Sequence, residues 1–173
     1  MSKSGGVGKT AAALGITDAK LIELLKSCEK VKCNAYSRYS HFRVGAALLT
    51  TPDDKGIIIT GCNIENASSG MTVCAERTAI CYAVAQGHRT FHCIAVTSDI
   101  DGRFCAPCGA CRQVIIEFAP NSAVILMKPG FSDEQYINGE GLHLTTIKEL
   151  LPFGFTPDDL AMPQIAHKDP YSS

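Results

Sequence analysis

Three cysteines and one glutamate, carried by two short segments, could together form a metal site. Cys74 and Glu76 are separated by one residue, and Cys108 and Cys111 follow in the sequence PCGACR. Three thiolates can hold a zinc ion and leave its fourth coordination position open, which is typical of catalytic rather than structural zinc. Glu76 is near enough to the first sulfur to move protons of a water molecule bound at that position. The spacing therefore favours metal-assisted hydrolysis.

The charge of such a centre predicts a cationic neighbour. Three thiolates around one zinc ion carry net negative charge, which opposes loss of a proton from bound water. Arg77 follows Glu76 directly, and its guanidinium could donate hydrogen bonds to the ligand sulfurs. Arg112 is a second, weaker candidate, and the alternative for both arginines is a solvated surface charge.

Cys105 leaves open a closed zinc site with four cysteine ligands. Cys105, Cys108 and Cys111 are evenly spaced, and a structural zinc would use all of them with Cys74. We favour the open site, because Pro107 separates an extended Cys105 from a following helix and a closed site leaves Glu76 without a role. The remaining cysteines are predicted to be small core residues: Cys28, Cys33, Cys62, Cys81 and Cys93.

The elements that must position these residues alternate between helices and strands. Helices are predicted from Thr17, as N-cap, to Val31, over 73–86, over 108–118 and over 146–151. Strands are predicted over 42–50 and 56–62, joined as a hairpin by PDDKG, and over 93–97 and 123–127, followed by a polar loop over 128–143. This order is typical of a layered α/β domain. Cys74 and Cys108 would each lie at a helix start, where thiolates are stabilised.

One domain over residues 16–160 is predicted, between a flexible tail at 1–15 and a weakly ordered tail at 161–173. The first tail contains GGVGKT, but a phosphate loop would need a glycine where Lys3 stands and a strand before it.

The 173 residues are 46% apolar, with 16 basic and 17 acidic side chains and nine cysteines. Near-neutral charge argues against nucleic acid or membrane partners, and the free cysteines favour a cytoplasmic protein.

Four segments in order resemble the free-nucleoside cytidine deaminases, across about residues 17–160. They are YSHF at 39–42 with VGAA at 44–47, GCNIENA at 61–67, CAERTA at 74–79 and PCGACRQ at 107–113. Three cysteine ligands, rather than a histidine and two cysteines, resemble the homotetrameric branch. The resemblance implies a three-layer α/β/α sandwich with a mixed five-stranded sheet, one zinc ion per subunit, and deamination of cytidine and deoxycytidine in pyrimidine salvage.

The resemblance also implies roles for individual residues. Cys74, Cys108 and Cys111 would bind zinc, Glu76 would shuttle protons, and Arg77 keeps its predicted place beside the sulfurs. The nucleoside would be held by the aromatic ring of Phe42, the polar side chains of Asn63 and Glu65 and the backbone of Ala75, with Phe155 reaching a neighbouring subunit's pocket.

Departures from the family pattern keep other functions open. Ser69 stands where relatives carry a tyrosine, and Arg38 where they carry a proline, so a deaminase of a nucleoside-like antibiotic remains an alternative, as does a structural zinc module. A polynucleotide deaminase is disfavoured by Cys74 and by the near-neutral charge. A nucleotide deaminase is disfavoured because Glu65 would repel a phosphate.

Overall fold

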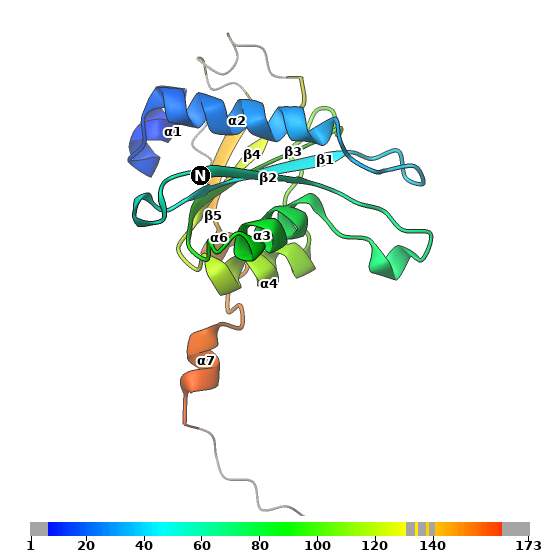
Figure 1. Ribbon diagram of the computed structural model, residues 1–173. Coiled ribbons are helices and arrows are strands. Elements are labelled where there is room, and N and C mark those ends of the chain that lie inside the picture. The colour runs from blue at the N-terminus through cyan, green and yellow to red at the C-terminus, as the bar shows by residue number, and fades with distance from the viewer. Residues whose placement is uncertain (1–6, 131–133, 135–137, 139–140, 164–173) are drawn as a thin grey trace, which may run out of the picture.

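A mixed five-stranded sheet is the centre of the computed structural model, which describes residues 7–130, 134, 138 and 141–163 (Figure 1). Its strands are β1 (Val44–Thr50), β2 (Ile58–Cys62), β3 (Phe91–Ser98), β4 (Ala123–Met127) and β5 (Leu142–Thr146). They lie in the order β2-β1-β3-β4-β5. β3 and β4 are parallel and the other neighbours antiparallel, so the predicted mixed sheet is confirmed.

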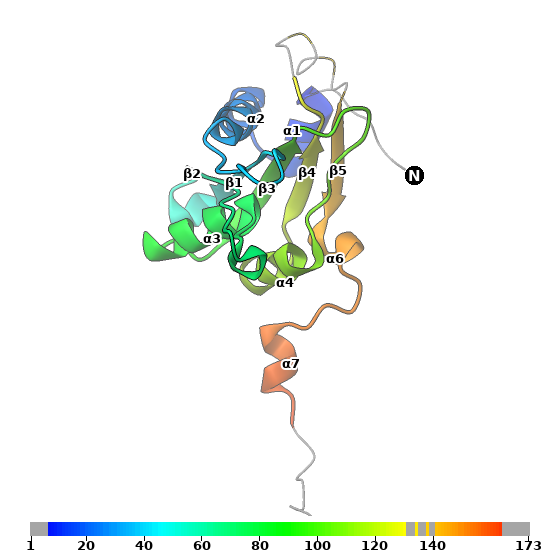
Figure 2. The ribbon, with the colours of Figure 1, turned by 90° about the vertical axis from the view of Figure 1, so that its right-hand side faces the viewer.

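Helices cover both faces of the sheet (Figures 1 and 2). One face carries α1 (Val7–Leu14) and α2 (Asp18–Lys32), and the other carries α3 (Ala75–Ala85), α4 (Gly109–Phe118) and α6 (Ile147–Leu150). Successive side chains of a strand point to opposite faces. Accordingly Ala46 and Leu48 pack with α3 and α4, whereas Ala47 and Leu49 pack with α1 and α2. The predicted α/β/α sandwich is confirmed.

Local chemistry explains most of the element boundaries. Thr17 caps α2 by accepting a hydrogen bond from the backbone N–H of Lys20 at 3.2 Å. Between β1 and β2 the chain turns through a short 3-10 helix at Pro52–Asp54, as the turn residues predict. Gly87 follows α3 with φ at +92°, a conformation that favours glycine. A second 3-10 helix, Ser69–Met71, precedes α3.

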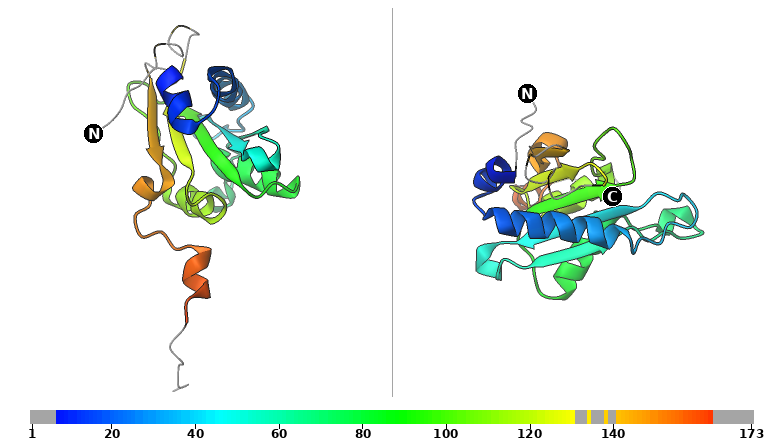
Figure 3. Two further views of the ribbon diagram at one scale, coloured as in Figure 1. Left: turned by 90° about the vertical axis from the view of Figure 1, so that its left-hand side faces the viewer. Right: turned by 90° about the horizontal axis from the view of Figure 1, so that it is seen from above.

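The N-terminal segment differs from the prediction. Of the flexible tail predicted for residues 1–15, Val7 to Leu14 form α1, and residues 1–6 lie outside the described part. Val7, Ala11 and Leu14, spaced by four and three, are buried in the cluster that α2 forms with the sheet. The prediction of a flexible tail relied on the overall composition of this segment and did not take this apolar stripe into account. The left view of Figure 3 shows α1 beside α2.

The C-terminal third also differs in part. β5 at Leu142–Thr146 overlaps the end of the loop predicted for 128–143, half of which lies outside the described residues. After α6, the chain leaves the sandwich and ends its described part in α7 (Pro157–Ala161), with residues 164–173 not described (Figure 1). None of the described helices is both long and apolar enough to cross a membrane.

Candidate metal centre and substrate pocket

The N-terminal ends of α3 and α4 bring the predicted cysteines together. Cys74 is the N-cap of α3 and Cys108 the N-cap of α4, both with extended backbones and neither with a side-chain capping bond. Cys111 lies in the first turn of α4 and is buried. The two helices lie side by side on one face of the sheet (Figures 1 and 2). Their free N–H groups therefore favour negative charge at the sulfurs.

The spacing of the three sulfurs fits a zinc ion. The Sγ atoms of Cys74 and Cys108 are 3.9 Å apart and those of Cys108 and Cys111 3.5 Å apart, and all three lie within 4.8 Å of one another. Tetrahedral zinc with bonds of about 2.3 Å would separate its sulfur ligands by about 3.8 Å. Among the described residues this is the sole such cluster of three or more histidine, cysteine or acidic side chains, and it does not include Cys105. The donor set therefore suits zinc with an open position.

Arg77 lies beside the sulfurs, as the charge argument predicts. Its guanidinium donates to Cys74 Sγ at 3.7 Å and to the backbone oxygen of Thr72 at 2.9 Å. Hydrogen bonds from Cys111 and from Arg77 lower the pKa of Cys74 to about 5. A thiol with so low a pKa is a thiolate at neutral pH, which is the form that binds metal.

Arg112 has a different position from the one considered for it. It donates from Nε to the backbone oxygen of Pro107 at 2.7 Å and from Nη1 to that of Leu150 at 2.8 Å. These bonds tie the start of α4 to the end of α6. Arg112 thus braces the helix that carries Cys108 and Cys111, while Arg77 is the arginine that donates to a ligand sulfur.

Glu76 is buried next to these thiols. Its side chain lies in the first turn of α3 and the residue is 3% exposed. Burial, with the charge of Cys74 adding to it, raises the pKa of the Glu76 carboxyl above its ordinary value. A carboxyl with a raised pKa can both accept and donate protons closer to neutral pH, which is the property that a proton-transfer group needs.

A pocket of about 230 Å³ joins the metal site to the sheet. Its lining combines apolar side chains with a few polar ones: Ser40, Phe42, Val44, Asn63, Glu65, Thr72, Cys74, Glu76, Val96, Cys105, Ala106 and Cys108. Three predicted substrate residues, Phe42, Asn63 and Glu65, therefore share one cavity with Cys74 and Glu76.

Comparison with known proteins agrees with this geometry. Residues 18–127 match the family described as the cytidine and deoxycytidylate deaminase zinc-binding region. The chain belongs to this family. A cytidine deaminase from Sporosarcina psychrophila is 42% identical over 139 residues, which are 80% of this chain and 93% of that protein. The crystal structure of cytidine deaminase from Burkholderia pseudomallei superposes with a TM-score of 0.67 at 40% identity, covering 78% of this chain and 98% of that one.

A relative named for another substrate also matches. Blasticidin-S deaminase from Bacillus cereus is 34% identical over 146 residues, which are 80% of this chain and 92% of that protein. The chain is accordingly an enzyme of the hydrolytic deaminase class.

Asn63 and Glu65 are engaged with the neighbouring backbone of the deaminase pocket. Asn63 donates from Nδ2 to the Phe42 oxygen at 2.9 Å and accepts at Oδ1 from the Val44 N–H at 2.8 Å. The Glu65 carboxylate accepts from the Tyr39 N–H at 2.8 Å, and its closest partner is the Ser40 hydroxyl, which lowers the pKa of Glu65. Both side chains therefore fix the segment that carries Phe42, and each keeps hydrogen-bonding capacity for a ligand.

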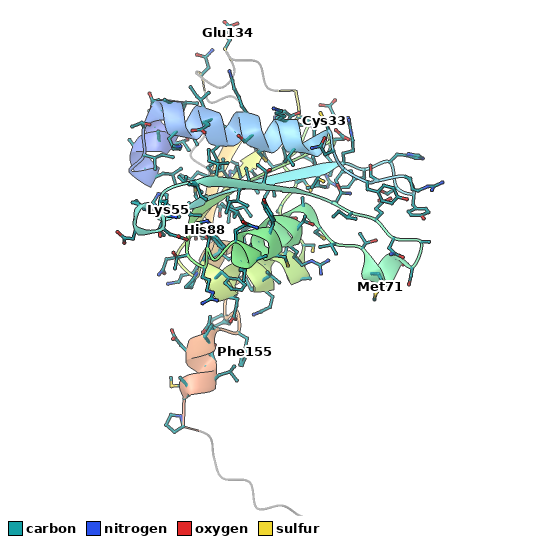
Figure 4. The ribbon with its side chains drawn as sticks, in the orientation of Figure 1. Cys33, Lys55, Met71, His88, Glu134 and Phe155 are labelled. Atoms are coloured by element: carbon teal, nitrogen blue, oxygen red, sulfur yellow. The ribbon has the colours of Figure 1, made fainter. Side chains whose placement is uncertain are left out.

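Two of the predicted substrate residues lie outside the pocket lining. Ala75 is fully buried as the first residue of α3. Phe155 follows α6, its backbone oxygen accepts from Gln113 Nε2 of α4 at 2.7 Å, and it is 56% exposed; Figure 4 shows it beside α7. Within one chain it does not line the pocket, and its assignment to a neighbouring subunit's pocket stays a prediction.

Ser40 and Thr72 line the pocket without having been given a role from the sequence, and Cys105, considered there only as a fourth zinc ligand, lines it as well. Ser40 lies in one of the segments that carry the resemblance, and this position could have identified it as a pocket residue. The predicted burial of the other cysteines is confirmed for Cys28 and Cys93. It holds only in part for Cys62, which is half-buried, and is wrong for Cys33 and Cys81, which are exposed.

Proposed function

We propose that this chain hydrolytically deaminates cytidine and deoxycytidine, giving uridine or deoxyuridine and ammonia. The observation that carries the proposal is one pocket in which the buried Glu76 lies beside Cys74 and Cys108, two of the three cysteines whose sulfurs are spaced for zinc. Zinc, held by Cys74, Cys108 and Cys111, would supply a Lewis acid and lower the pKa of water. Family membership supports the reaction, since the relatives that match are named for cytidine deamination.

Glu76 would move the protons of this reaction. Water addition to the pyrimidine requires a proton to be taken from the attacking water and given to the ring nitrogen, and loss of ammonia requires one at the departing amino group. A single carboxyl with a raised pKa can serve all these steps in turn. Burial of Glu76 supports this role by raising its pKa. A surface glutamate, with an ordinary pKa far below neutral pH, would stay ionised and be a poor proton donor.

The other lining residues would select a nucleoside. Phe42 offers an aromatic face to the base, Asn63 and Glu65 offer hydrogen-bonding groups to the ribose hydroxyls, and the backbone of Ala75 would contact the base. The negative charge of Glu65 disfavours a nearby phosphate, so nucleosides rather than nucleotides are the proposed substrates. Arg77 would offset the charge of the thiolates.

The assembly and its place in the cell belong to the same proposal. We infer a homotetramer with one zinc ion per subunit, in which Phe155 contributes to a neighbouring pocket. Its exposure, on a segment that packs on α4 only in part, supports a role between subunits. A cytoplasmic location and a part in pyrimidine salvage follow from this activity as further proposals.

A second candidate is deamination of a nucleoside-like antibiotic. It is favoured by the match to a blasticidin-S deaminase and by Ser69, which stands where family members commonly carry a tyrosine.

Both candidates can be compared in one experiment. Loss of ultraviolet absorbance would be followed for cytidine, deoxycytidine, cytidine monophosphate, blasticidin S and a cytosine-containing oligonucleotide, with zinc measured on the same sample. Fast turnover of the two nucleosides alone supports the main proposal. Turnover of blasticidin S without turnover of cytidine supports the second, and a zinc-loaded protein inactive on every compound contradicts both.

A further inference from the structure

A charge network around one buried lysine lies on the face of the sheet opposite to α3 and α4. The Lys32 side chain, at the end of α2, is 5% exposed. Its Nζ lies 2.7 Å from Glu29 Oε1 and 3.4 Å from Asp99 Oδ1. Glu29 in turn accepts from the Thr97 hydroxyl at 3.0 Å. A buried ammonium between two carboxylates is held in one arrangement, because moving away from either carboxylate leaves a charge unpaired.

Close packing of α2 on β1 explains why Lys32 is buried there. A Cβ atom at Gly45 would lie 2.3 Å from the backbone oxygen of Cys28 and 3.0 Å from the backbone nitrogen of Lys32. Helix and strand backbones therefore approach closely enough to require glycine. This contact fixes the end of α2, and with it Lys32, beside the first residues of β1.

Asp99 connects this network to the backbone that enters the pocket. Its Oδ2 accepts from Arg43 Nε at 2.8 Å and from the Arg43 backbone N–H at 3.3 Å, and its Oδ1 accepts from Arg43 Nη2 at 3.3 Å. Burial opposes ionisation of Asp99, but Arg43 and Lys32 together lower its pKa. Asp99 therefore holds both the side chain and the main chain of Arg43 as an ionised group.

The peptide unit that joins Phe42 to Arg43 is thus held at both of its polar groups. Asp99 accepts from its N–H, Asn63 donates to its oxygen, and Asn63 also accepts from the Val44 N–H. His41, just before it, has φ at +56°, which a non-glycine residue keeps only where neighbouring contacts hold it. Figure 4 places Cys33, next to Lys32, at the end of the molecule that also carries Met71, opposite to Lys55 and His88.

We propose that Asp99, held in place by the buried Lys32, is a positioning residue for the nucleoside pocket: it fixes Arg43 and thereby the ring of Phe42. The inference rests on the proposed function for the identity of the ligand. An aromatic ring that packs on the base contributes to binding in the ground state and the transition state alike. Loosening it should therefore raise KM while kcat stays nearly constant.

The test compares Asp99→Asn with Glu23→Gln. Both changes turn a carboxylate into a carboxamide of the same shape, and Glu23 pairs with Lys20 on the exposed face of α2, outside the network. Lys32 keeps Glu29 as a partner in Asp99→Asn, so folding is retained. Loss of the charged hydrogen bonds to Arg43 should raise the KM for cytidine about tenfold with kcat within about twofold, and Glu23→Gln should match the wild type. A lower kcat with unchanged KM would show a smaller active fraction, and thus a merely structural Asp99, and would overturn the inference.

Arg43→Met supplies a second variant, since Arg43 is largely exposed and its loss leaves the core intact. If Asp99 acts through Arg43, the double variant that combines Asp99→Asn with Arg43→Met should have a KM for cytidine no higher than that of Asp99→Asn alone. If the two substitutions raised the KM additively, Asp99 would not act through Arg43, and the inference would be overturned.

Amide hydrogen exchange tests the inference without any substrate. The peptide covering residues 36–43 contains the Arg43 amide bound by Asp99, and this one amide should exchange about tenfold faster in Asp99→Asn and at the wild-type rate in Glu23→Gln. Unchanged exchange in Asp99→Asn overturns the positioning role. Failure of the wild type to deaminate cytidine would instead contradict the proposed function, and the exchange result would still decide the inference.

Discussion

Replacing Arg77 by glutamine should weaken zinc binding without unfolding the protein. The guanidinium donates to Cys74 Sγ at 3.7 Å and to the Thr72 oxygen at 2.9 Å. A hydrogen bond to a charged group contributes about 1.5–3 kcal/mol. Because Arg77 is only partly buried, solvent screening places the loss near the lower end, about 1.5–2 kcal/mol. Since about 1.4 kcal/mol corresponds to a factor of ten, zinc affinity should fall about 10- to 30-fold.

Competition with a chelator of known affinity at pH 7 measures this change. Arg77→Lys should recover part of the affinity, since it restores the charge without the planar fork. Arg89→Gln is the matched control, because Arg89 is exposed and lies beyond α3, away from the sulfurs. Zinc affinity of Arg77→Gln within about twofold of the wild type would refute the claim that Arg77 stabilises the thiolates.

Three further predictions concern the metal and the packing. Cys108→Ala should lose bound zinc and melt at a lower temperature, because metal binding is linked to folding; a full zinc equivalent in a folded variant would contradict the ligand assignment. Gly61→Ala should lower the free energy of unfolding, measured in urea, by about 2–3 kcal/mol, because the added Cβ would lie 2.4 Å from the Ala79 nitrogen in α3. Gly70→Ala is the control and should be near neutral, because open space surrounds Gly70. In metal-free protein the folded chain binds the Glu76 proton more tightly than the unfolded chain, so this contribution to stability is lost as pH rises. Metal-free wild type should therefore lose stability relative to metal-free Glu76→Gln as pH rises above 4.5; parallel stability profiles would contradict the burial argument.

The metal site was predictable because its chemistry is local. Cys74 and Glu76 lie on one turn of α3, and Cys108 and Cys111 on one turn of α4, so spacing alone sets each half of the site. Capping and turn residues likewise predict where α2 begins and where β1 turns into β2. The substrate-binding roles predicted for Phe42, Asn63 and Glu65 came from the resemblance, because their residue types alone do not distinguish a ligand contact from a structural one.

Long-range contacts account for what the sequence did not predict. α1 forms because Val7, Ala11 and Leu14 pack against α2, whereas a helix of only eight residues is marginally stable by itself. β5 is a short edge strand whose pairing with β4 depends on the sheet already being present. The burial of Lys32 depends on a glycine thirteen residues later in the chain and on Asp99 at the end of β3, and such juxtapositions have no local pattern.

The most direct test of the proposed chemistry is a comparison of turnover and ligand binding in Glu76→Gln. Glutamine keeps the shape of the buried side chain but cannot carry protons, so zinc content and binding of a non-hydrolysable cytidine analogue should stay near the wild-type values. Turnover of cytidine should fall by about 10²–10⁴-fold or more, the range expected for loss of a general acid–base group. Turnover within tenfold of the wild type in a zinc-loaded variant would contradict the assignment of proton transfer to Glu76.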